Sequence, residues 1–265
     1  MIELYHTHNS VCSQKVRMAL FEKNIDWKSN HLLLAKREHQ TPEYLKLNPK
    51  GVVPTLIDGG EVICESTVII EYLNDEHPDP PLMPRGGRSK PRVRQLMKKI
   101  DDDIHMPGTN VVTFAIALRH IFAEQGPEGV KKWIESIPTE RHRPLFVDLM
   151  ENGLNAQEFA PSLRIFKNMF IDLEEKLEGQ DWLVDDTYTL ADLSYAPYLA
   201  RVDRLSLQEG IINQYPNVAA WYQRLQARPA FIKAIEEFDD PKYVGTLRKK
   251  GAELADQVVE IYVNL

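Results

Sequence analysis

The chain has 265 residues, of which 43% are hydrophobic and 27% charged, as in a globular protein with room for two modest domains. Its formal net charge of −7 argues against a nucleic-acid-binding surface, and no apolar run is long enough for a transmembrane helix. The N-terminus shows no secretory signal, and two cysteines make no disulfide framework. We therefore expect a cytoplasmic protein that contacts neither membrane nor nucleic acid.

The N-terminal residues predict a strand, a polar turn and a helix. The helix has apolar residues at three- and four-residue spacing: Val16, Ala19, Leu20 and Phe21. Ser10 and Ser13 are both candidate N-caps, and we favour Ser13. His6 and His8 are expected at the strand end and in the exposed turn, where either could bind substrate but a neutral role is commoner. A second strand begins at residues 25–27, which completes a βαβ unit.

The stretch Asn48-Pro49-Lys50-Gly51-Val52-Val53-Pro54-Thr55-Leu56 predicts a turn and a sharp corner before a hairpin. Pro54 cannot donate to a central ladder, so it must stand at a strand start, an edge or a bend. We expect a cis Val53–Pro54 bond, which would turn the backbone N–H and C=O of Val53 outward to pair with an extended peptide. Glu65, Ser66 and Thr67 then open a helix, whose N-terminus favours a carboxylate. The alternative is an edge-strand proline followed by an ordinary helix cap.

Together these segments resemble the glutathione S-transferases. The run Ser10-Val11-Cys12-Ser13-Gln14-Lys15-Val16-Arg17 aligns without gaps with the zeta-class motif Ser-Ser-Cys-x-x-Arg-Val-Arg, with departures at Val11 and Lys15. Residues 48–54 and Glu65-Ser66 match the family's glutathione-binding corner and γ-glutamyl site. The resemblance implies an α/β plus all-α fold, in which a thioredoxin-like βαβ–ββα domain precedes an all-helical domain.

The composition changes within residues 76–87, where prolines and a glycine pair predict a linker. We expect a thioredoxin-like, glutathione-binding domain at 1–80, a linker at 81–89 and an all-helical domain at 90–265 with an extended tail.

The helical half has two distinctive segments. Residues 125–160 must form short helices and loops because they carry or adjoin four prolines: Pro127, Pro138, Pro144 and Pro161. Thr189-Leu190-Ala191-Asp192 predicts a capping box with Asp192 in the N3 position, opening a buried helix. We assign Asp192 to folding and not to catalysis. A helical tail follows Asp240.

The catalytic expectation concerns the thiol of glutathione, the co-substrate that the resemblance implies. A thiol pKa near 8.5 leaves only a few per cent thiolate at pH 7. A hydroxyl hydrogen bond and a helix N-terminus could lower this pKa, and Ser10 is the candidate donor by position. Three alternatives stay open: Ser10 as a plain cap, Asn9 as the donor through its amide, and Cys12 as a nucleophile forming a mixed disulfide.

The resemblance also implies how the rest of glutathione is anchored. Glu65 would meet the γ-glutamyl ammonium, Ser66 with Thr67 the adjacent carboxylate, and Val53 beside Pro54 the cysteinyl backbone. His39, Gln40 and Lys50 are placed for the glycyl carboxylate. The alternative for Glu65 and Ser66 is a helix-capping pair, and the two interpretations are compatible. No His-x-x-x-His or Cys-x-x-Cys spacing occurs, so no metal is expected.

We therefore predict a homodimeric glutathione transferase that attacks a small hydrophobic electrophile, in detoxification or aromatic catabolism. Seven apolar or aromatic residues are candidates for the electrophile pocket: Met97, Ile100, Ile104, Met106, Phe114, Tyr195 and Tyr198. The long 125–160 segment and the tail resemble the bacterial β-aryl etherases, in which the thiolate displaces an aryl ether next to a ketone. Val11 argues against maleylacetoacetate isomerase. A non-catalytic binding protein and a thiol-disulfide reductase are the rival interpretations.

Overall fold

A computed structural model describes residues 1–137 and 139–265 of the chain. Pro138, one of the four predicted breaks, lies outside the described residues. The chain forms two compact units, the first made of residues 1–98, 180–198 and 221–240 and the second of residues 99–179, 199–220 and 241–265. Because these units interleave along the chain, the linear division at 80 and 90 stays a prediction.

The first unit contains a four-stranded mixed sheet in the order β2-β1-β3-β4. Its strands are β1 (Ile2–His6), β2 (Trp27–His31), β3 (Thr55–Asp58) and β4 (Glu61–Cys64). β1 is parallel to β2 and antiparallel to β3, and β3 and β4 form a hairpin that turns at two glycines with positive φ, Gly59 and Gly60. This order and these directions confirm the predicted βαβ–ββα topology.

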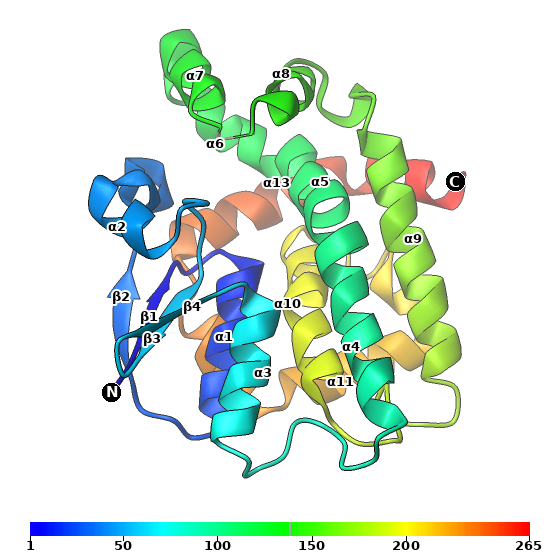
Figure 1. Ribbon diagram of the computed structural model, residues 1–265. Coiled ribbons are helices and arrows are strands. Elements are labelled where there is room, and N and C mark those ends of the chain that lie inside the picture. Colours follow the sequence, from blue (N-terminus) through cyan, green and yellow to red (C-terminus); the bar gives the residue numbers. More distant parts are fainter. Residues whose placement is uncertain (138) are drawn as a thin grey trace. The chain divides into compact units, whose positions relative to one another are not determined.

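Helices of the first unit enclose this sheet. They begin with α1 (Val11–Glu22), η1 (Leu34–Lys36), η2 (Glu38–Gln40), α2 (Pro42–Leu47), α3 (Ser66–Glu76) and α4 (Ser89–Lys99). Figure 1 shows α1 and α3 side by side, and α1 also packs against α12 (Pro229–Phe231) and η8 (Ile232–Glu236). Leu4 of β1 and Leu20 of α1 are fully buried, so the core of the unit lies between the sheet and these helices.

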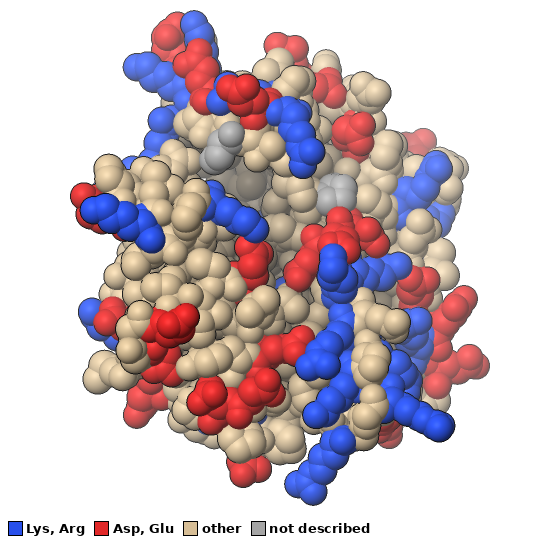
Figure 2. All heavy atoms as spheres, in the orientation of Figure 1, with Lys and Arg blue, Asp and Glu red and all other residues tan. Residues whose placement is uncertain are grey.

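Helix α4 is amphipathic. Val93, Leu96 and Met97 are buried, whereas Figure 2 shows lysine and arginine side chains gathered over this helix. Two of these cations pair with carboxylates of the same unit, Arg92 with Asp185 and Arg94 with Glu71, each at 2.8 Å. The basic face of α4 is thus a solvent-exposed face with neighbouring counter-charges.

Among its described residues the second unit contains helices, turns and loops but no strand. Its elements are η3 (Ile100–Asn110), α5 (Val111–Thr113), η4 (Phe114–Leu118), α6 (Arg119–Ala123), α7 (Gly126–Glu135), η5 (Glu140–His142), α8 (Arg143–Asn152), η6 (Gly153–Asn155), α9 (Phe159–Lys176), η7 (Ile212–Gln214) and α13 (Pro241–Val263). Helices α10 (Leu190–Arg204) and α11 (Pro216–Gln226) each continue from one unit into the other. The short helices within 125–160 and the helical tail confirm two predictions. No described helix has the length and hydropathy to cross a bilayer.

Within the second unit, aromatic rings join the short helices of the 125–160 segment. Trp133 of α7 stacks on Phe122 of α6 at 4.1 Å between ring centroids and on Phe114 of η4 at 5.2 Å, and Phe146 of α8 meets both Trp133 and Phe114 edge-on. Aromatic pairs of this kind add about 0.5–1.5 kcal/mol each beyond their buried area. The cluster explains how a proline-broken segment keeps a defined conformation.

The capping box at the start of α10 is present as predicted. The Asp192 carboxylate is fully buried and accepts four hydrogen bonds, from the backbone N–H of Leu183 and Thr189, the Thr189 hydroxyl and the Trp221 indole, at 2.9–3.1 Å. Burial raises the pKa of Asp192 to about 6, and these donors oppose the rise. At pH 7 the group is mostly an ionised carboxylate, which can only accept and therefore matches four donors.

Asp192→Asn should destabilise the protein by about 3 kcal/mol, because the new amide N–H₂ must face two donors that lose their acceptor. Denaturant unfolding of the two proteins measures this difference. We expect the activity of the remaining folded fraction to stay near the wild-type value. A variant that is as stable as the wild type, or one that is stable but inactive, would contradict a purely structural role for Asp192.

Candidate functional site

The turn between β1 and α1 carries the predicted thiol-binding residues. Ser10 is the N-cap of α1, and its Oγ accepts the backbone N–H of Ser13 at 3.2 Å. Our preference for Ser13 as the cap was therefore wrong. A serine hydroxyl has one donor and two acceptor positions, so an Oγ that accepts from Ser13 can still donate its hydrogen to a ligand. The capping and the thiol-binding interpretations of Ser10 are compatible.

Asn9 and Cys12 flank Ser10 and are both half-buried, as Ser10 itself is. Cys12 lies in the first turn of α1, where the helix N-terminus favours an anion. Neither Cys12 nor Cys64 takes part in a disulfide among the described residues. The geometry leaves Asn9 and Cys12 as candidates beside Ser10.

His6 lies at the end of β1 and His8 in the turn, as expected. His6 is fully buried, so the expectation of an exposed side chain was wrong for it. Burial, and after it the positive charge of Arg17, lowers the pKa of His6 to about 3. His8 lies on the turn, stacks on His31 with 3.0 Å between Nδ1 and Nε2, and points its Nε2 toward Asp240 at 3.7 Å.

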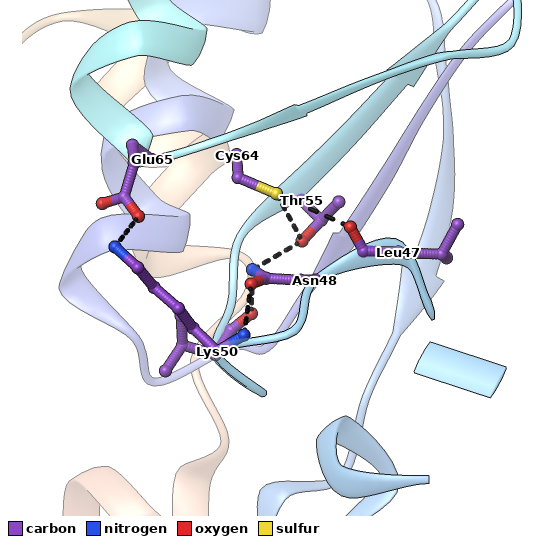
Figure 3. Close-up of polar contacts among 7 residues, drawn as sticks. Leu47, Asn48, Lys50, Thr55, Cys64 and Glu65 are labelled. Atoms are coloured by element: carbon purple, nitrogen blue, oxygen red, sulfur yellow. Dashed lines mark hydrogen bonds and ion pairs between the residues drawn. The ribbon is translucent and has the colours of Figure 1, made fainter. Parts of the chain in front are cut away.

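The Val53–Pro54 bond is cis, as the sequence predicts, and a network of side chains holds the corner around it. The carbonyl of Val52 accepts from the Tyr44 hydroxyl at 2.6 Å and from Asn48 Nδ2 at 2.9 Å. Asn48 Nδ2 also donates to Thr55 Oγ1, and Asn48 Oδ1 accepts the backbone N–H of Lys50. All the hydrogen-bonding groups of the Asn48 amide are thus directed at the backbone or side chains of the corner, as Figure 3 shows.

Two further groups complete this corner. Tyr44 is buried, and this burial raises its pKa to about 12, so the phenol keeps the hydrogen that it donates. The Cys64 thiol points to the carbonyl of Leu47 at 3.8 Å and lies 4.0 Å from Thr55 Oγ1. Cys64 is half-buried at the edge of the network.

The start of α3 combines an exposed acid with a buried hydroxyl. Glu65 precedes the helix with φ +69°, a backbone conformation that costs a residue other than glycine about 1–3 kcal/mol and that clusters at functional sites of proteins. Its side chain makes no capping hydrogen bond, which contradicts the alternative of a capping pair. Instead its carboxylate pairs with Lys50 Nζ at 2.7 Å, and this hydrogen bond and charge raise the pKa of Lys50 (Figure 3).

The next two residues are the first two of helix α3, and a buried lysine contacts the second of them. Ser66 is buried at the first position of α3, and the Thr67 hydroxyl accepts a hydrogen bond at 3.2 Å from Nζ of the buried Lys15. A helix N-terminus with a neighbouring cation favours an anion. This arrangement suits a ligand with an ammonium near Glu65 and a carboxylate near Ser66.

The residues predicted for the glycyl carboxylate come from two segments. His39 and Gln40 are half-buried in η2, and burial together with Arg37 lowers the pKa of His39. His39 is therefore neutral at pH 7 and offers a single N–H rather than a charge. The two segments meet at Gly51, where an added Cβ would stand 3.2 Å from the carbonyl oxygen of His39. The structure thus brings η2 close to the turn that carries Lys50, and Lys50 is already engaged by Glu65.

The residues proposed for the electrophile pocket are mostly core residues. Six of them are at most 2% exposed: Met97, Ile100, Ile104, Phe114, Tyr195 and Tyr198. Met106 is half-buried and lies 3.4 Å, at its sulfur, from Asn110 Nδ2. Six of these residues at helical spacing are thus buried in the packing of the helices and are not exposed to a ligand. Among the described residues, no group of three His, Cys, Asp or Glu side chains could hold a metal ion.

The first unit thus combines a thioredoxin-like sheet, a cis-proline corner and two helix N-termini that carry Ser10 and Ser66, an arrangement that suits a peptide with a thiol. Family models bear this out: the glutathione S-transferase N-terminal domain matches residues 4–81, and the C-terminal domain of that family matches residues 150–229. The chain belongs to the glutathione S-transferase family, a family of glutathione-dependent enzymes.

The chain is similar to relatives of two kinds within this family. It is 31% identical to maleylacetoacetate isomerase of Dictyostelium discoideum, over 88% of this chain and 93% of the relative. It is 28% identical to the protein LigF of Sphingobium sp. SYK-6, over 96% of this chain and 99% of the relative. The crystal structure of the β-etherase LigF superposes with a TM-score of 0.77 at 27% identity, covering 89% of this chain and 99% of that one.

His6 should make the protein sensitive to acid. The folded state holds His6 neutral down to about pH 3, whereas an unfolded histidine binds a proton near pH 6.5. The unfolded state therefore gains a proton that the folded state does not bind as the pH falls through this interval. This difference at His6 lowers the free energy of unfolding by about 2 kcal/mol at pH 5.

Unfolding free energies at pH 7 and pH 5 for the wild type and His6→Gln test this. The wild type should lose more stability than the variant over this interval. An equal loss in both proteins would show that His6 is not the residue responsible.

Proposed function

We propose that the protein lowers the pKa of the glutathione thiol through Ser10 and uses the thiolate to attack a small hydrophobic electrophile. The observation that carries this proposal is the position of Ser10 at the N-cap of α1, in the same unit as the Val53–Pro54 corner and the Glu65–Ser66 helix start. Lowering a thiol pKa by about two units requires roughly 2.7 kcal/mol of preferential thiolate stabilisation. A hydroxyl hydrogen bond added to a helix N-terminus is of this size.

Glutathione would bind as an extended peptide across the first unit. Its cysteinyl backbone would pair with Val53, its γ-glutamyl group would meet Glu65, Ser66 and Thr67, and its glycyl carboxylate would meet His39, Gln40 and Lys50. The existing Lys50–Glu65 ion pair supports a further detail. The γ-glutamyl ammonium can replace Lys50 at the Glu65 carboxylate, and Lys50 then becomes available for the glycyl carboxylate.

Aryl ethers next to a ketone are the substrate class that we propose. The support is the match to LigF, which extends over nearly the whole of both chains and so includes the 125–160 segment and the tail. In the reaction the thiolate sulfur forms a bond to the carbon beside the carbonyl, the carbon–oxygen bond to the aryl group breaks, and the aryloxide takes up a proton. The products are a glutathione thioether and a phenol.

We also propose a homodimer in the cytoplasm. Exposed apolar side chains support a partner subunit, among them Val62 of β4 at 37% and Val68 of α3 at 55% exposure. Light scattering of the purified protein should then give about twice the mass of one chain, and Val68→Lys should reduce it. A monomer in the wild type would contradict this part of the proposal.

Ser10→Ala should raise the midpoint at which bound glutathione forms its thiolate by about one to two pH units, because one hydrogen bond to the anion is lost. The ultraviolet absorbance of the thiolate across pH measures this midpoint. Asn9→Ala and Cys12→Ser are the matched controls in the same turn and should leave it nearly unchanged. A midpoint that moves with Asn9 or Cys12 and not with Ser10 would transfer the role to that residue.

A β-aryl ether with an adjacent ketone should yield a phenol and a glutathione thioether, which chromatography with mass detection resolves. The same ether with the ketone reduced to an alcohol is the control and should not react, because the carbonyl activates the neighbouring carbon. If the protein instead isomerises a cis double bond next to a carbonyl, the isomerase relatives would be the better guide. If it binds glutathione without forming a thiolate, it would be a binding protein.

A further inference from the structure

Arg17 is a cation buried in the first unit that the proposed chemistry does not use. It lies in the middle of α1 between Val16 and Met18, and all three side chains are excluded from solvent. A buried guanidinium is costly unless its N–H groups are hydrogen-bonded. The partners that it has are therefore informative.

Three of its hydrogen bonds go to the end of β1 and the turn that follows. Arg17 Nη1 lies 2.9 Å from the carbonyl oxygen of Thr7 and 3.1 Å from His6 Nδ1, and Nη2 lies 3.1 Å from the carbonyl oxygen of His8. Because arginine can only donate, His6 accepts at Nδ1 and carries its hydrogen on Nε2, which meets Ser29 Oγ at 2.8 Å.

On its other side Arg17 is fixed by the segment that follows α12. Nε donates to the carbonyl oxygen of Ala234 at 2.8 Å, and the guanidinium lies 4.4 Å from the centre of the Phe238 ring. A planar, always charged guanidinium suits this set of carbonyls and a ring face, and an ammonium does not match it. The side chain therefore has little freedom to move.

The turn has additional supports of the same kind. Gln14 Nε2 donates to the carbonyl oxygen of His8 at 3.4 Å, and the backbone N–H of Thr7 reaches Ser13 Oγ at 3.4 Å. Both backbone groups of Thr7 and the carbonyl of His8 are thus held, and Ser10 follows two residues later. Side chains of α1 determine where this turn leaves the strand.

We propose that Arg17 is a positioning residue that holds the 7–10 turn so that Ser10 can donate to the thiolate of glutathione. The inference rests on the proposed function. Arg17 touches neither substrate nor reacting atoms in this account, and it acts only through the backbone of the turn. The thiolate stabilisation by Ser10 should then depend on Arg17 although the Ser10 side chain is unchanged.

Arg17→Lys and Arg17→Gln test this, with Arg228→Gln as the matched control. Arg228 belongs to the same unit, pairs with Glu22 at 2.6 and 2.8 Å and lies over the Tyr188 ring at 3.5 Å. Arg228 makes no described contact with the turn. Its variant should therefore lose stability without changing the pKa of the bound glutathione thiol. Thermal unfolding and the thiolate titration midpoint of bound glutathione are measured for all four proteins.

The Arg17 variants should raise the midpoint by about 0.5–1 pH unit, which is roughly a 3- to 10-fold loss of thiolate at a fixed pH below the midpoint. The loss should fall on kcat more than on the KM for glutathione, and Arg17→Lys should retain more than Arg17→Gln. Arg228→Gln should show a lower unfolding temperature and the wild-type midpoint. Ser10→Ala combined with Arg17→Gln should raise the midpoint no further than Ser10→Ala alone.

An unchanged midpoint in a folded Arg17 variant would overturn the inference while leaving the proposed function intact. If wild-type protein neither binds glutathione nor forms its thiolate, the proposed function fails first, and the two failures are distinct. If neither Arg17 variant folds, Phe238→Leu replaces them. This variant removes the ring that packs against the Arg17 guanidinium but keeps the hydrogen bonds of Arg17. A smaller rise of the midpoint is expected there, and no rise would overturn the inference.

Discussion

The carbonyl of Val52 is held by two donors, the phenol of Tyr44 and the amide of Asn48, and the candidate site is built around this pair of hydrogen bonds. A ligand that pairs with the backbone of Val53 needs that backbone in one conformation before it binds, since ordering it later would weaken binding. Tyr44 and Asn48 provide this order from α2 and the residue after it. The corner is rigid because buried side chains fix its backbone, and Thr55 links both of them to β3.

The same principle governs the other two parts of the site, and in each a cation of α1 supplies the support. Lys15 reaches Thr67 at the start of α3, and Arg17 reaches the turn that carries Ser10. Buried cations are costly, and each is stabilised here because its N–H groups donate to oxygen atoms of a functional segment. Helix α1 thereby connects the two helix N-termini that the proposed function assigns to the thiol and to the γ-glutamyl group.

Features encoded by local sequence were predictable. The Val53–Pro54 corner, the Thr189–Asp192 capping box and the short helices of 125–160 depend on proline, on hydrogen bonding within a few residues and on apolar spacing, and each is found as predicted. The order of the motifs also predicted the mixed sheet, because a βαβ unit followed by a hairpin leaves few ways to pair the strands.

What escaped prediction depends on contacts between distant residues. Nothing local distinguishes Ser10 from Ser13 as a cap, and His6 is buried only because β2, Arg17 and Phe238 surround it. The cis bond at Asp79–Pro80 lay in a segment that we interpreted only as a linker. One signal could have been used: Arg17 stands among Val16, Met18, Ala19 and Leu20, and a cation on an apolar helix face indicates a buried partner.

A crystal structure of the glutathione complex would test how this site holds the thiol and the γ-glutamyl group. We expect a binding mode in which the cysteinyl backbone pairs with Val53, the γ-glutamyl ammonium lies at Glu65 with Lys50 displaced from it, and the sulfur lies within hydrogen-bonding distance of Ser10 Oγ. Glutathione bound in the reverse direction, or with its sulfur directed at Cys12 and away from Ser10, would contradict it.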